Sequence, residues 1–458
     1  MPLENVRPDD VLPMAERREA GRALRRLVPR GLHATWQTPQ QRRDPVEMLV
    51  ESTRHRISSL LPIRYGRMQA SPFAFLRGSA ALMAADLSST PTSAIWVQAC
   101  GDCHSANFGV YSTLDGLPIF DLTDFDETLP APFEWDLKRL AVSVAVDARS
   151  RMMPERACRT LASGVVSAYR QQMARLMQLD PQTGWRSRVH VAKVLRGIPE
   201  PKLRQAELRR LRIAADAHRK GYRRLLERGK SGWRIRRQLP CVAPAPAVHD
   251  ETLDVVARTA FEAYKVSQPE DRAVLLDRYR LTDVAFKVVG IGSVGAFCAL
   301  GLFTDRDGAA LLLQLKEAQQ SVLMPYTAPS AYLNQGQRVV TGQRIMQGEH
   351  DMFLGWTQEH GSDQYCYVRQ LKDARLAAVG EGIVDAALPY YASLCGMTLA
   401  RAHSRSGDAA RISGYMGSSG AFDTAIADFA LAYAVQVESD WRLFAEAIKA
   451  KVIEARVE

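Results

Sequence analysis

Apolar side chains recur at helical spacing through most of the first 180 residues. Residues 46–90 carry this pattern, and within 133–179 the side chains of Leu137 and Leu140 lie about one helical turn apart. Residues 1–45 are charged and interrupted by prolines, so we expect a poorly ordered or peripheral arm there. The N-terminal half of the chain is therefore predicted to be mainly helical.

Short runs of β-branched, aromatic and aliphatic residues interrupt these helices and dominate the middle of the chain. Runs of this length and composition are typical of strands. The sequence predicts strands at 95–99, 117–120, 284–289, 296–303, 309–316 and 365–369, and helices at 251–264, 334–347, 383–403 and the C-terminus. We expect an α+β protein with an arm at 1–45, a mostly helical segment at 46–280, an antiparallel sheet at 281–375, and helices at 376–458 that pack on the first helical segment.

The composition is that of an ordinary globular protein, with 47% hydrophobic and 24% charged residues. No stretch approaches 18 uninterrupted apolar residues, so we expect no membrane span. The N-terminus lacks the apolar run of a signal peptide, and seven cysteines do not form a disulfide framework, so we expect a cytoplasmic protein with reduced thiols. The oligomeric state is not readable from these features.

The net charge of +10 is concentrated in one segment. Residues 184–240 contain 18 Lys and Arg against 4 Asp and Glu, and a run with three prolines at 240–246 is interpreted as a linker after them. A solvated helical insert is the preferred interpretation, with an acidic partner as the alternative. A nucleic-acid partner is disfavoured because the segment lacks interleaved aromatics and a recognised binding motif.

The segment 101–107 and the acidic run 120–127 have the residues that phosphoryl transfer requires. That reaction needs a carboxylate near the attacking hydroxyl, and amide and carboxylate oxygens that hold a metal ion against the phosphates. Asp102 and Asn107 lie five residues apart on one predicted loop, and Asp124 follows about 17 residues later near a strand end. Hard oxygen ligands of this kind suit Mg²⁺.

The two segments, with the Trp-Asp-Leu that starts the next helix, resemble the aminoglycoside-phosphotransferase branch of the protein-kinase-like superfamily. The resemblance implies that Asp102 is the catalytic base and that Asn107 and Asp124 are metal ligands, with Asp126 as a possible auxiliary ligand. His104 and Asp136 would act beside them, Asp136 by bracing the loop. The structural alternative for such Asp and Asn residues is an Asx-turn or a helix cap.

Residues 100–104 also match C-x-x-C-H, the attachment pattern of c-type haem. Haem attachment would need export, and neither a signal peptide nor a distal ligand motif is found. A zinc half-site would need a second cysteine pair, which the sequence does not offer at the usual spacing. We therefore treat both as minor alternatives.

A glycine-rich turn and a lysine follow much later in the chain. The turn comprises Gly290, Gly292, Ser293 and Gly295, and glycines there allow a close approach of backbone N–H groups to phosphates. The residues after it continue as a strand, which favours the kinase pattern over the dinucleotide-binding one. Lys316 ends an apolar strand, where an anion such as the α- and β-phosphates of ATP would compensate it.

The helix at 334–347 occupies the position of the kinase helix whose glutamate pairs with this lysine, but it contains no Glu. Glu317 or Glu349 is the expected substitute. The helix ending at His403 resembles the one that ordinarily precedes the catalytic loop, and Asp408 follows it as a possible accessory residue.

The order of these motifs is rotated relative to a kinase, because the catalytic loop precedes the glycine-rich turn. A circular permutation explains the order if the helix ending at His403 abuts the strand that begins at Ile95. This order of motifs, together with the sequence segments 71–78 and 368–373, closely resembles an uncharacterised bacterial family. That family is a domain of unknown function (number two-two-five-two). Arg77, in the first of these segments, is a candidate for binding a phosphate group of the acceptor.

The sequence therefore predicts a circularly permuted, two-lobed protein-kinase-like fold with extra helical segments. The expected activity is Mg²⁺–ATP-dependent phosphotransfer to an acceptor that is a small molecule or a protein. The alternatives are transfer of AMP to a protein on the same fold, and an inactive nucleotide-binding scaffold.

Overall fold

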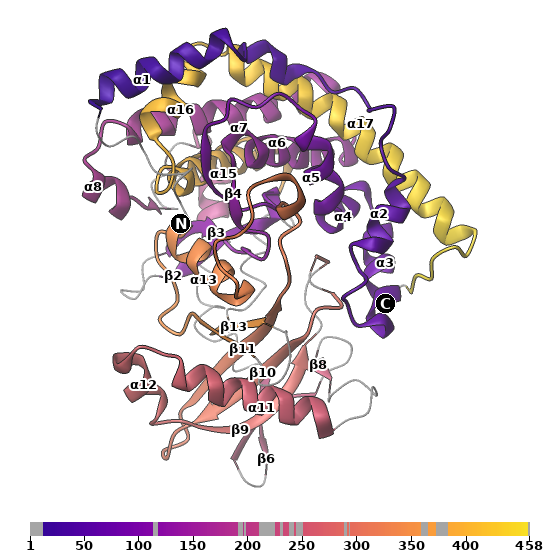
Figure 1. Ribbon diagram of the computed structural model, residues 1–458, viewed down its shortest axis with the longest axis vertical. Helices are drawn as coiled ribbons and strands as arrows, with labels where there is room; N and C mark the ends of the chain where they lie inside the picture. Colours follow the sequence, from indigo (N-terminus) through magenta and orange to yellow (C-terminus); the bar gives the residue numbers. More distant parts are fainter. Residues whose placement is uncertain are drawn as a thin grey trace.

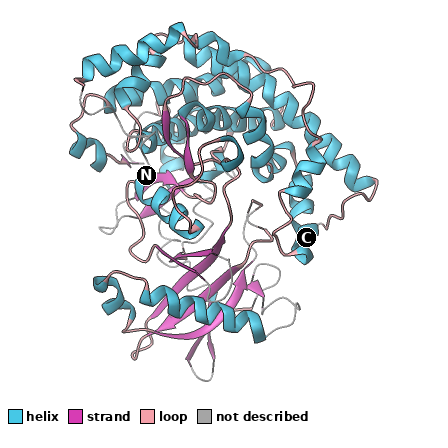
Figure 2. Ribbon diagram, in the orientation of Figure 1, coloured by secondary structure: helices cyan, strands magenta, loops and turns pink. Residues whose placement is uncertain are grey.

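The protein has a helical part and a sheet part, with the small strands and α13 between them (Figure 1). The computed structural model describes residues 12–112, 118–190, 196, 198–209, 225–229, 232–237, 242–243, 251–287, 291–292, 294–358, 365–371 and 383–456. Helices and strands are both abundant, which confirms the α+β class (Figure 2).

The largest sheet has six antiparallel strands in the order β12-β13-β11-β10-β9-β8. Its strands are β8 (Val242–Ala243), β9 (Arg280–Lys287), β10 (Cys298–Thr304), β11 (Ala310–Ala318), β12 (Gly355–Gln358) and β13 (Tyr365–Gln370). Four of the six were predicted within a few residues, whereas β8 and β12 were not.

Alternating side chains of this sheet supply two separate cores, because successive residues of a strand point to opposite faces. Leu313 of β11 lies in the core under α11 (Glu251–Val266), where Phe261 packs edge-on against Phe303. Leu312 lies on the other face, which the hairpin of β6 (Leu226–Gly229) and β7 (Gly232–Ile235) covers. α12 (Glu270–Leu276) follows α11.

The helical part is organised around α6 (Phe133–Ser150), which is buried over most of its length and packs against α7 and α17. The remaining helices are α1 (Met14–Ala23), α2 (Pro45–Glu51), α3 (Leu61–Gln69), α4 (Pro72–Gly78), α5 (Ala80–Ser88), α7 (Glu155–Leu176), α8 (Pro181–Arg186), α13 (Gln335–Met346), α15 (Leu388–His403), α16 (Ala409–Met416) and α17 (Ala421–Lys449). None of the helices in the described ranges is long and apolar enough to cross a lipid bilayer.

Two small sheets support the loops between the two parts. β1 (Trp96–Ala99) pairs with β4 (Leu129–Pro132), and β2 (Phe108–Ser112), β3 (Pro118–Leu122) and β5 (Val189–His190) form a three-stranded sheet. The ends of β1 and β3 therefore lead into the two segments that carry the predicted chemistry.

Residues 12–45 pack on the outside of the helical part and do not form a poorly ordered arm (Figure 1). α1 packs on α16, and a Cβ added to Gly21 would collide with the backbone of Arg411. His33 is fully buried and its Nε2 lies 2.7 Å from the hydroxyl of Tyr415. Small residues at the helix crossing allow this close approach, and sequence periodicity does not reveal it.

The basic segment 184–240 and the linker also differ from expectation. Part of the segment is helical, but Leu226–Gly229 and Gly232–Ile235 pair with each other as the antiparallel strands β6 and β7. Within the interpreted linker, Val242 and Ala243 pair with β9 as an edge strand. The hairpin uses its apolar Leu226 and Ile235 to cover the sheet, so part of this segment has a packing role.

Candidate active site

A cleft lies where the predicted motifs meet. Its walls come from α2–α5, the loop after β1, the acidic run after β3, the glycine-rich turn and the end of β11. The charged residues that line it are Arg56, Arg64, Arg77, Asp102, Asp124, Asp126, Glu127 and Glu317.

The loop after β1 is held by a carboxylate on α6. Gly101 has a φ of +82°, and a Cβ there would collide with the carbonyl of Glu127, so glycine is required. The carboxylate of Asp136 accepts the backbone N–H groups of Cys100 at 2.6 Å and of Gly101 at 2.9 Å. His403 lies 3.1 Å from the same carboxylate. Asp136 and His403 thus brace the loop from beneath.

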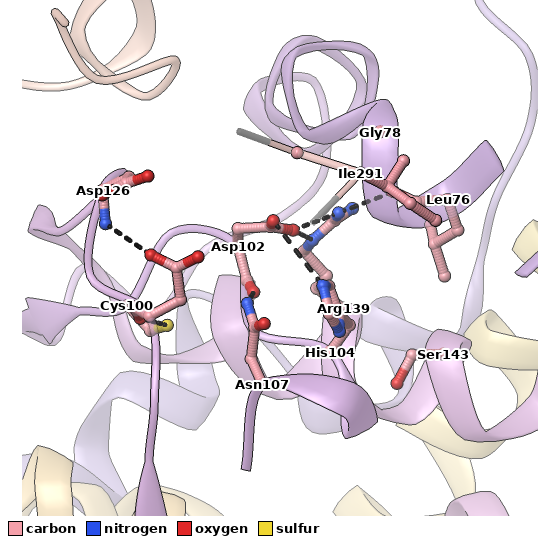
Figure 3. A network of polar contacts seen from close by, with 12 residues as sticks. Leu76, Gly78, Cys100, Asp102, His104, Asn107, Asp126, Arg139, Ser143 and Ile291 are labelled. Atoms are coloured by element: carbon pink, nitrogen blue, oxygen red, sulfur yellow. Dashed lines mark hydrogen bonds and ion pairs between the residues drawn. The ribbon is translucent and has the colours of Figure 1, made fainter. Parts of the chain in front are cut away.

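Asp102 points into the cleft with one oxygen held by an arginine (Figure 3). Nε of Arg139 donates to Oδ1 of Asp102 at 2.8 Å, and Nη2 of Arg139 contacts the same oxygen. Oδ2 lies 3.7 Å from Nε2 of His104. Burial, with the charges of Arg77 and Arg139, lowers the pKa of His104 well below its usual value, so this imidazole is neutral at pH 7.

Asn107 closes the same loop. Its side-chain Nδ2 donates to the backbone carbonyl of Asp102 at 2.7 Å, which leaves Oδ1 as the atom able to ligate a cation. Its own carbonyl accepts the N–H of Thr123 at 2.9 Å. This hydrogen bond joins the loop to the residue immediately before Asp124.

Lys316 meets the acidic run after β3. It is 2% exposed, forms an ion pair with Asp126, and its Nζ lies 4.0 Å from Oδ1 of Asp124. Tyr367, opposite Lys316 on β13, donates to Oδ1 of Asp126 at 2.7 Å. Burial alone would lower the pKa of Lys316, but the two carboxylates raise it, so the lysine is charged.

The two aspartates are not equivalent. Burial and the neighbouring charge of Asp126 raise the pKa of Asp124. Burial also opposes ionisation of Asp126, but Lys316 and Tyr367 lower its pKa. Asp124 is therefore the carboxylate whose contact with Lys316 is the longer of the two, and the one whose charge a bound metal ion would stabilise most.

The glycine-rich turn lies over Asp102. A Cβ added to Gly292 would be 3.6 Å from the carbonyl of Arg77 and 4.0 Å from Oδ2 of Asp102. Gly295 has a φ of +90° and packs on the side chain of Arg56. Gly290 and Ser293, which the sequence places in the same turn, lie outside the described residues.

The expected substitutes for the missing helix glutamate are not found at Lys316. Glu317 accepts the N–H of Phe297 at 2.9 Å, and Glu349 pairs with Arg188. The acid that pairs with Lys316 is Asp126 instead. On α13, Arg338 donates to the carbonyls of Thr128 and Asp126 at 2.7 and 2.8 Å and so anchors the acidic run.

Asp408 is not part of the cleft. Its carboxylate accepts the N–H groups of Ala410 at 2.9 Å and Arg411 at 3.2 Å, so it caps α16, and it pairs with Arg17. These contacts give it the role of a helix N-cap, as is common for an Asp before a helix. Arg77, in contrast, does line the cleft.

The residues that match C-x-x-C-H are packed too closely to hold a haem. Cys100 and Cys103 are free thiols that are 1% and 0% exposed, and His104 is 2% exposed. Burial raises the pKa of Cys103 well above its usual value, which makes a reactive thiolate or a zinc ligand unfavourable.

The donor set fits a magnesium–phosphate ligand in its chemistry. Asn107 and Asp124 offer hard oxygen atoms, and Lys316 offers a cation beside Asp124. In the ranges that the structure describes, no group of three or more His, Cys, Asp or Glu side chains converges as a metal centre. The protein would thus supply part of the coordination of Mg²⁺, with phosphate oxygens and water supplying the rest, as this cation prefers.

Four functional candidates were not anticipated: Arg56, Arg64, Glu127 and Arg139. Arg139 could have been found, because it follows Asp136 by three residues on one helix and so shares its face. Glu127 adjoins the predicted Asp126. No pattern in the sequence marks Arg56 and Arg64.

A family model described as an uncharacterised protein conserved in bacteria (DUF2252) matches residues 56–447. No curated protein and no solved structure matches the chain.

Proposed function

This chain belongs to that family of uncharacterised bacterial proteins (DUF2252), and we propose that it is a Mg²⁺–ATP-dependent phosphotransferase with a kinase-like site. The observation that carries the proposal is a convergence. Asp102, the turn around Gly292, and the pair Lys316–Asp126 come from distant parts of the chain and line or adjoin one cleft. Separate sequence motifs predict a role in phosphoryl transfer for Asp102, for the glycine-rich turn, for Lys316 and for Asp126.

The geometry around Asp102 supports its role as the base that receives the proton of an acceptor hydroxyl. Arg139 holds Oδ1, so Oδ2 is the oxygen left toward the cleft. His104 lies beside it, and we propose that this neutral imidazole positions the carboxylate and does not itself take the proton. A base must lie within hydrogen-bond reach of its proton, which a residue on a fixed loop achieves.

Asn107 and Asp124 would hold Mg²⁺, with Asp126 as an auxiliary ligand, and Lys316 would contact the phosphates. A bound metal ion would neutralise the negative charge that develops between the phosphates during transfer. The acidic and the basic side chains that line the cleft come from different elements. Asp124, Asp126 and Glu127 follow β3, and the arginines belong to the α2–α4 region. A metal–phosphate ligand carries both signs of charge and matches this separation.

A two-lobed, circularly permuted kinase-like fold is the arrangement we propose for these elements. The sheet that carries Lys316 would be one lobe and the helical part the other. A circular permutation requires the end of α15 to lie next to β1, and two contacts support this. The N–H of Gln98 on β1 donates to Oγ of Ser406 at 2.8 Å, three residues after α15 ends at His403. Gly407 approaches Val97 closely enough that a Cβ would touch it.

An inactive nucleotide-binding scaffold is the second candidate, and two observations favour it. α13 has no glutamate for Lys316, which is already paired with Asp126. The turn at Gly292 is also close to Asp102, so it must lift to admit a terminal phosphate beside the base.

Transfer of label from ATP tests the proposal. The purified protein would be incubated with Mg²⁺ and ATP labelled at the γ- or the α-phosphorus, together with fractionated bacterial metabolites or proteins. Transfer of the γ label that is lost in Asp102→Asn and Asp124→Asn supports phosphotransfer. Transfer of the α label instead supports AMP transfer. Mg²⁺–ATP binding with no transfer of either label supports the scaffold and contradicts the proposal.

A further inference from the structure

Two arginines of the α2–α3 region line the cleft without an acidic partner. Arg56 and Arg64 each form no ion pair with any carboxylate of the described residues, and each has a buried Nε atom without a hydrogen-bond partner. Both contact the glycine-rich turn.

Arg64 is 3% exposed and donates only to neutral carbonyl groups. Its Nη1 lies 2.6 Å from the carbonyl oxygens of both Ile291 and Gly292, and its Nη2 lies 2.7 Å from that of Gly78. Carbonyl groups satisfy hydrogen bonds but do not cancel a charge. Burial, followed by the charge of Arg56, lowers the pKa of Arg64 to about 9.

Arg56 is half-buried and uses little of its hydrogen-bonding capacity. Its Nη1 donates to the carbonyl of Val294 at 2.8 Å, and this is its one hydrogen bond to the described residues. A guanidinium has five N–H donors. The remaining donors include those of Nη2, on a side chain that lines the cleft. Burial lowers the pKa of Arg56 as well.

Other buried arginines of this chain differ from these two in partner or in position. Several buried or half-buried arginines have carboxylate partners: Arg42 with Asp86 and Asp440, Arg139 with Asp102, Arg170 with Asp423, and Arg401 with Asp121. Arg338, Arg344 and Arg405 contact only neutral groups, as Arg56 and Arg64 do, but none of these three lines the cleft. Two neighbouring guanidinium groups that face a cleft without a carboxylate in ion-pair contact are costly unless an anion binds them.

We propose that Arg56 and Arg64 form a binding subsite for a phosphate group. A dianionic phosphate has the charge to offset both arginines, and planar guanidinium groups bind phosphate oxygens in pairs. Asp126, Glu127 and Glu317 also act on Arg56, but none of the three is within ion-pair distance of it. They raise its basicity without occupying its donors.

The position of the subsite suggests what it does. Arg64 holds the carbonyl of Gly292, and the same turn lies against Asp102. A phosphate bound at the arginines would therefore lie beside the proposed base. Its source is either an acceptor that already carries a phosphate or the terminal phosphate of the nucleotide. The subsite would add a substrate contact to the proposed function. Binding of phosphate at the two arginines does not require that the proposed function is correct.

Titration with inorganic phosphate tests the subsite without nucleotide or metal. Thermal stability would be followed at constant ionic strength, with chloride replacing phosphate as the reference. We expect phosphate to stabilise the wild type, and Arg56→Gln to weaken its binding by at least about tenfold, the effect of losing charged hydrogen bonds. Arg54→Gln, an exposed arginine two residues away, is the matched control and should respond like the wild type.

Arg64→Lys is a second variant that keeps the charge but loses the forked hydrogen bonds to the turn, and it should also weaken phosphate binding. If the wild type gains no more from phosphate than from chloride, or if folded Arg56→Gln responds as fully as Arg54→Gln, the subsite is refuted.

A final titration adds phosphate to protein saturated with Mg²⁺–ATP. Independent binding assigns the subsite to an acceptor phosphate, and competition assigns it to the nucleotide. Because the first titration contains no ATP, failure of ATP binding would refute the proposed function and leave the subsite intact.

Discussion

Arg139 donates from Nε to Oδ1 of Asp102 over 2.8 Å, and this ion pair sets the direction of the proposed catalytic carboxylate. Arg139 is itself fixed by a hydrogen bond of 2.8 Å from Nη2 to the carbonyl of Leu76. The carboxylate therefore has one oxygen bound to the protein interior and one available to the cleft. The same arginine links the loop after β1 to α4, the helix that carries Arg77.

Replacing Arg139 should destabilise the protein more than replacing its partner. Arg139→Gln leaves Asp102 charged and largely buried, and we expect a loss of about 3 kcal/mol in the free energy of unfolding. Asp102→Asn should cost less, and the double variant should recover part of the loss. Urea unfolding of the four proteins measures the coupling, and strictly additive effects would contradict the importance of the pair.

Gly101→Ala should disrupt the catalytic loop. The residue has a φ of +82° and no space for a Cβ beside Glu127, so we expect destabilisation of roughly 1–3 kcal/mol or more. Gly164 is the control, because it lies inside α7 with open space around it. Gly164→Ala should stabilise by up to about 1 kcal/mol. Equal thermal shifts for the two variants would show that the loop tolerates a side chain.

Glu127 should make stability depend on pH. Burial raises the pKa of this carboxyl from 4.5 to about 7 in the folded protein. The folded state then holds a proton that the unfolded state releases, so its contribution to stability falls as pH rises from about 4.5 to 7, by up to about 1.4 kcal/mol per unit. Glu127→Gln keeps an acceptor for the N–H of Val322 and removes this dependence.

Denaturant unfolding of the wild type and Glu127→Gln across that range provides the measurement. The advantage of the variant should grow between pH 4.5 and 7 and stay constant above. Parallel curves for the two proteins would contradict a raised pKa.

Lys316→Met should create an unbalanced pair of carboxylates. Without the lysine, the half-buried Asp124 and Asp126 repel each other, and the pKa values of both should rise. We expect a loss of about 3 kcal/mol at pH 7.5 that shrinks toward pH 4, where both become protonated. Lys449→Met, at an exposed position, is the control. A loss that is independent of pH would argue for a packing role of Lys316 instead.

Short apolar runs made much of the sheet predictable from the sequence. The run 365–369 became β13 (Tyr365–Gln370), in which the consecutive side chains of Cys366, Tyr367 and Val368 are buried. The helix predicted at 334–347 became α13 (Gln335–Met346). Packing between elements was harder to predict. α1 reaches α16 through Gly21 and Gly414, and glycines at a helix crossing leave no periodic signal.

For the site, chemistry was predictable where it depends on spacing along one loop. Asp102 and Asn107 share a turn, and the hydrogen bond between them follows from their separation. Partners that meet only in three dimensions were missed. The pairing of Lys316 with Asp126, 190 residues away, replaced the expected glutamate, and the approach of Arg64 to Gly292 had no signal in the sequence.

The central claim is that the cleft binds ATP through a metal ion at Asp124. A thermal-shift titration with ATP, with and without Mg²⁺, on the wild type and Asp124→Ala tests it most directly. Ligand at 100 times its dissociation constant should stabilise the wild type by about 2.7 kcal/mol in the presence of Mg²⁺, and this shift should disappear in Asp124→Ala or with a chelator. No shift with millimolar Mg²⁺–ATP in the wild type, or an equal shift in both proteins, would contradict the account.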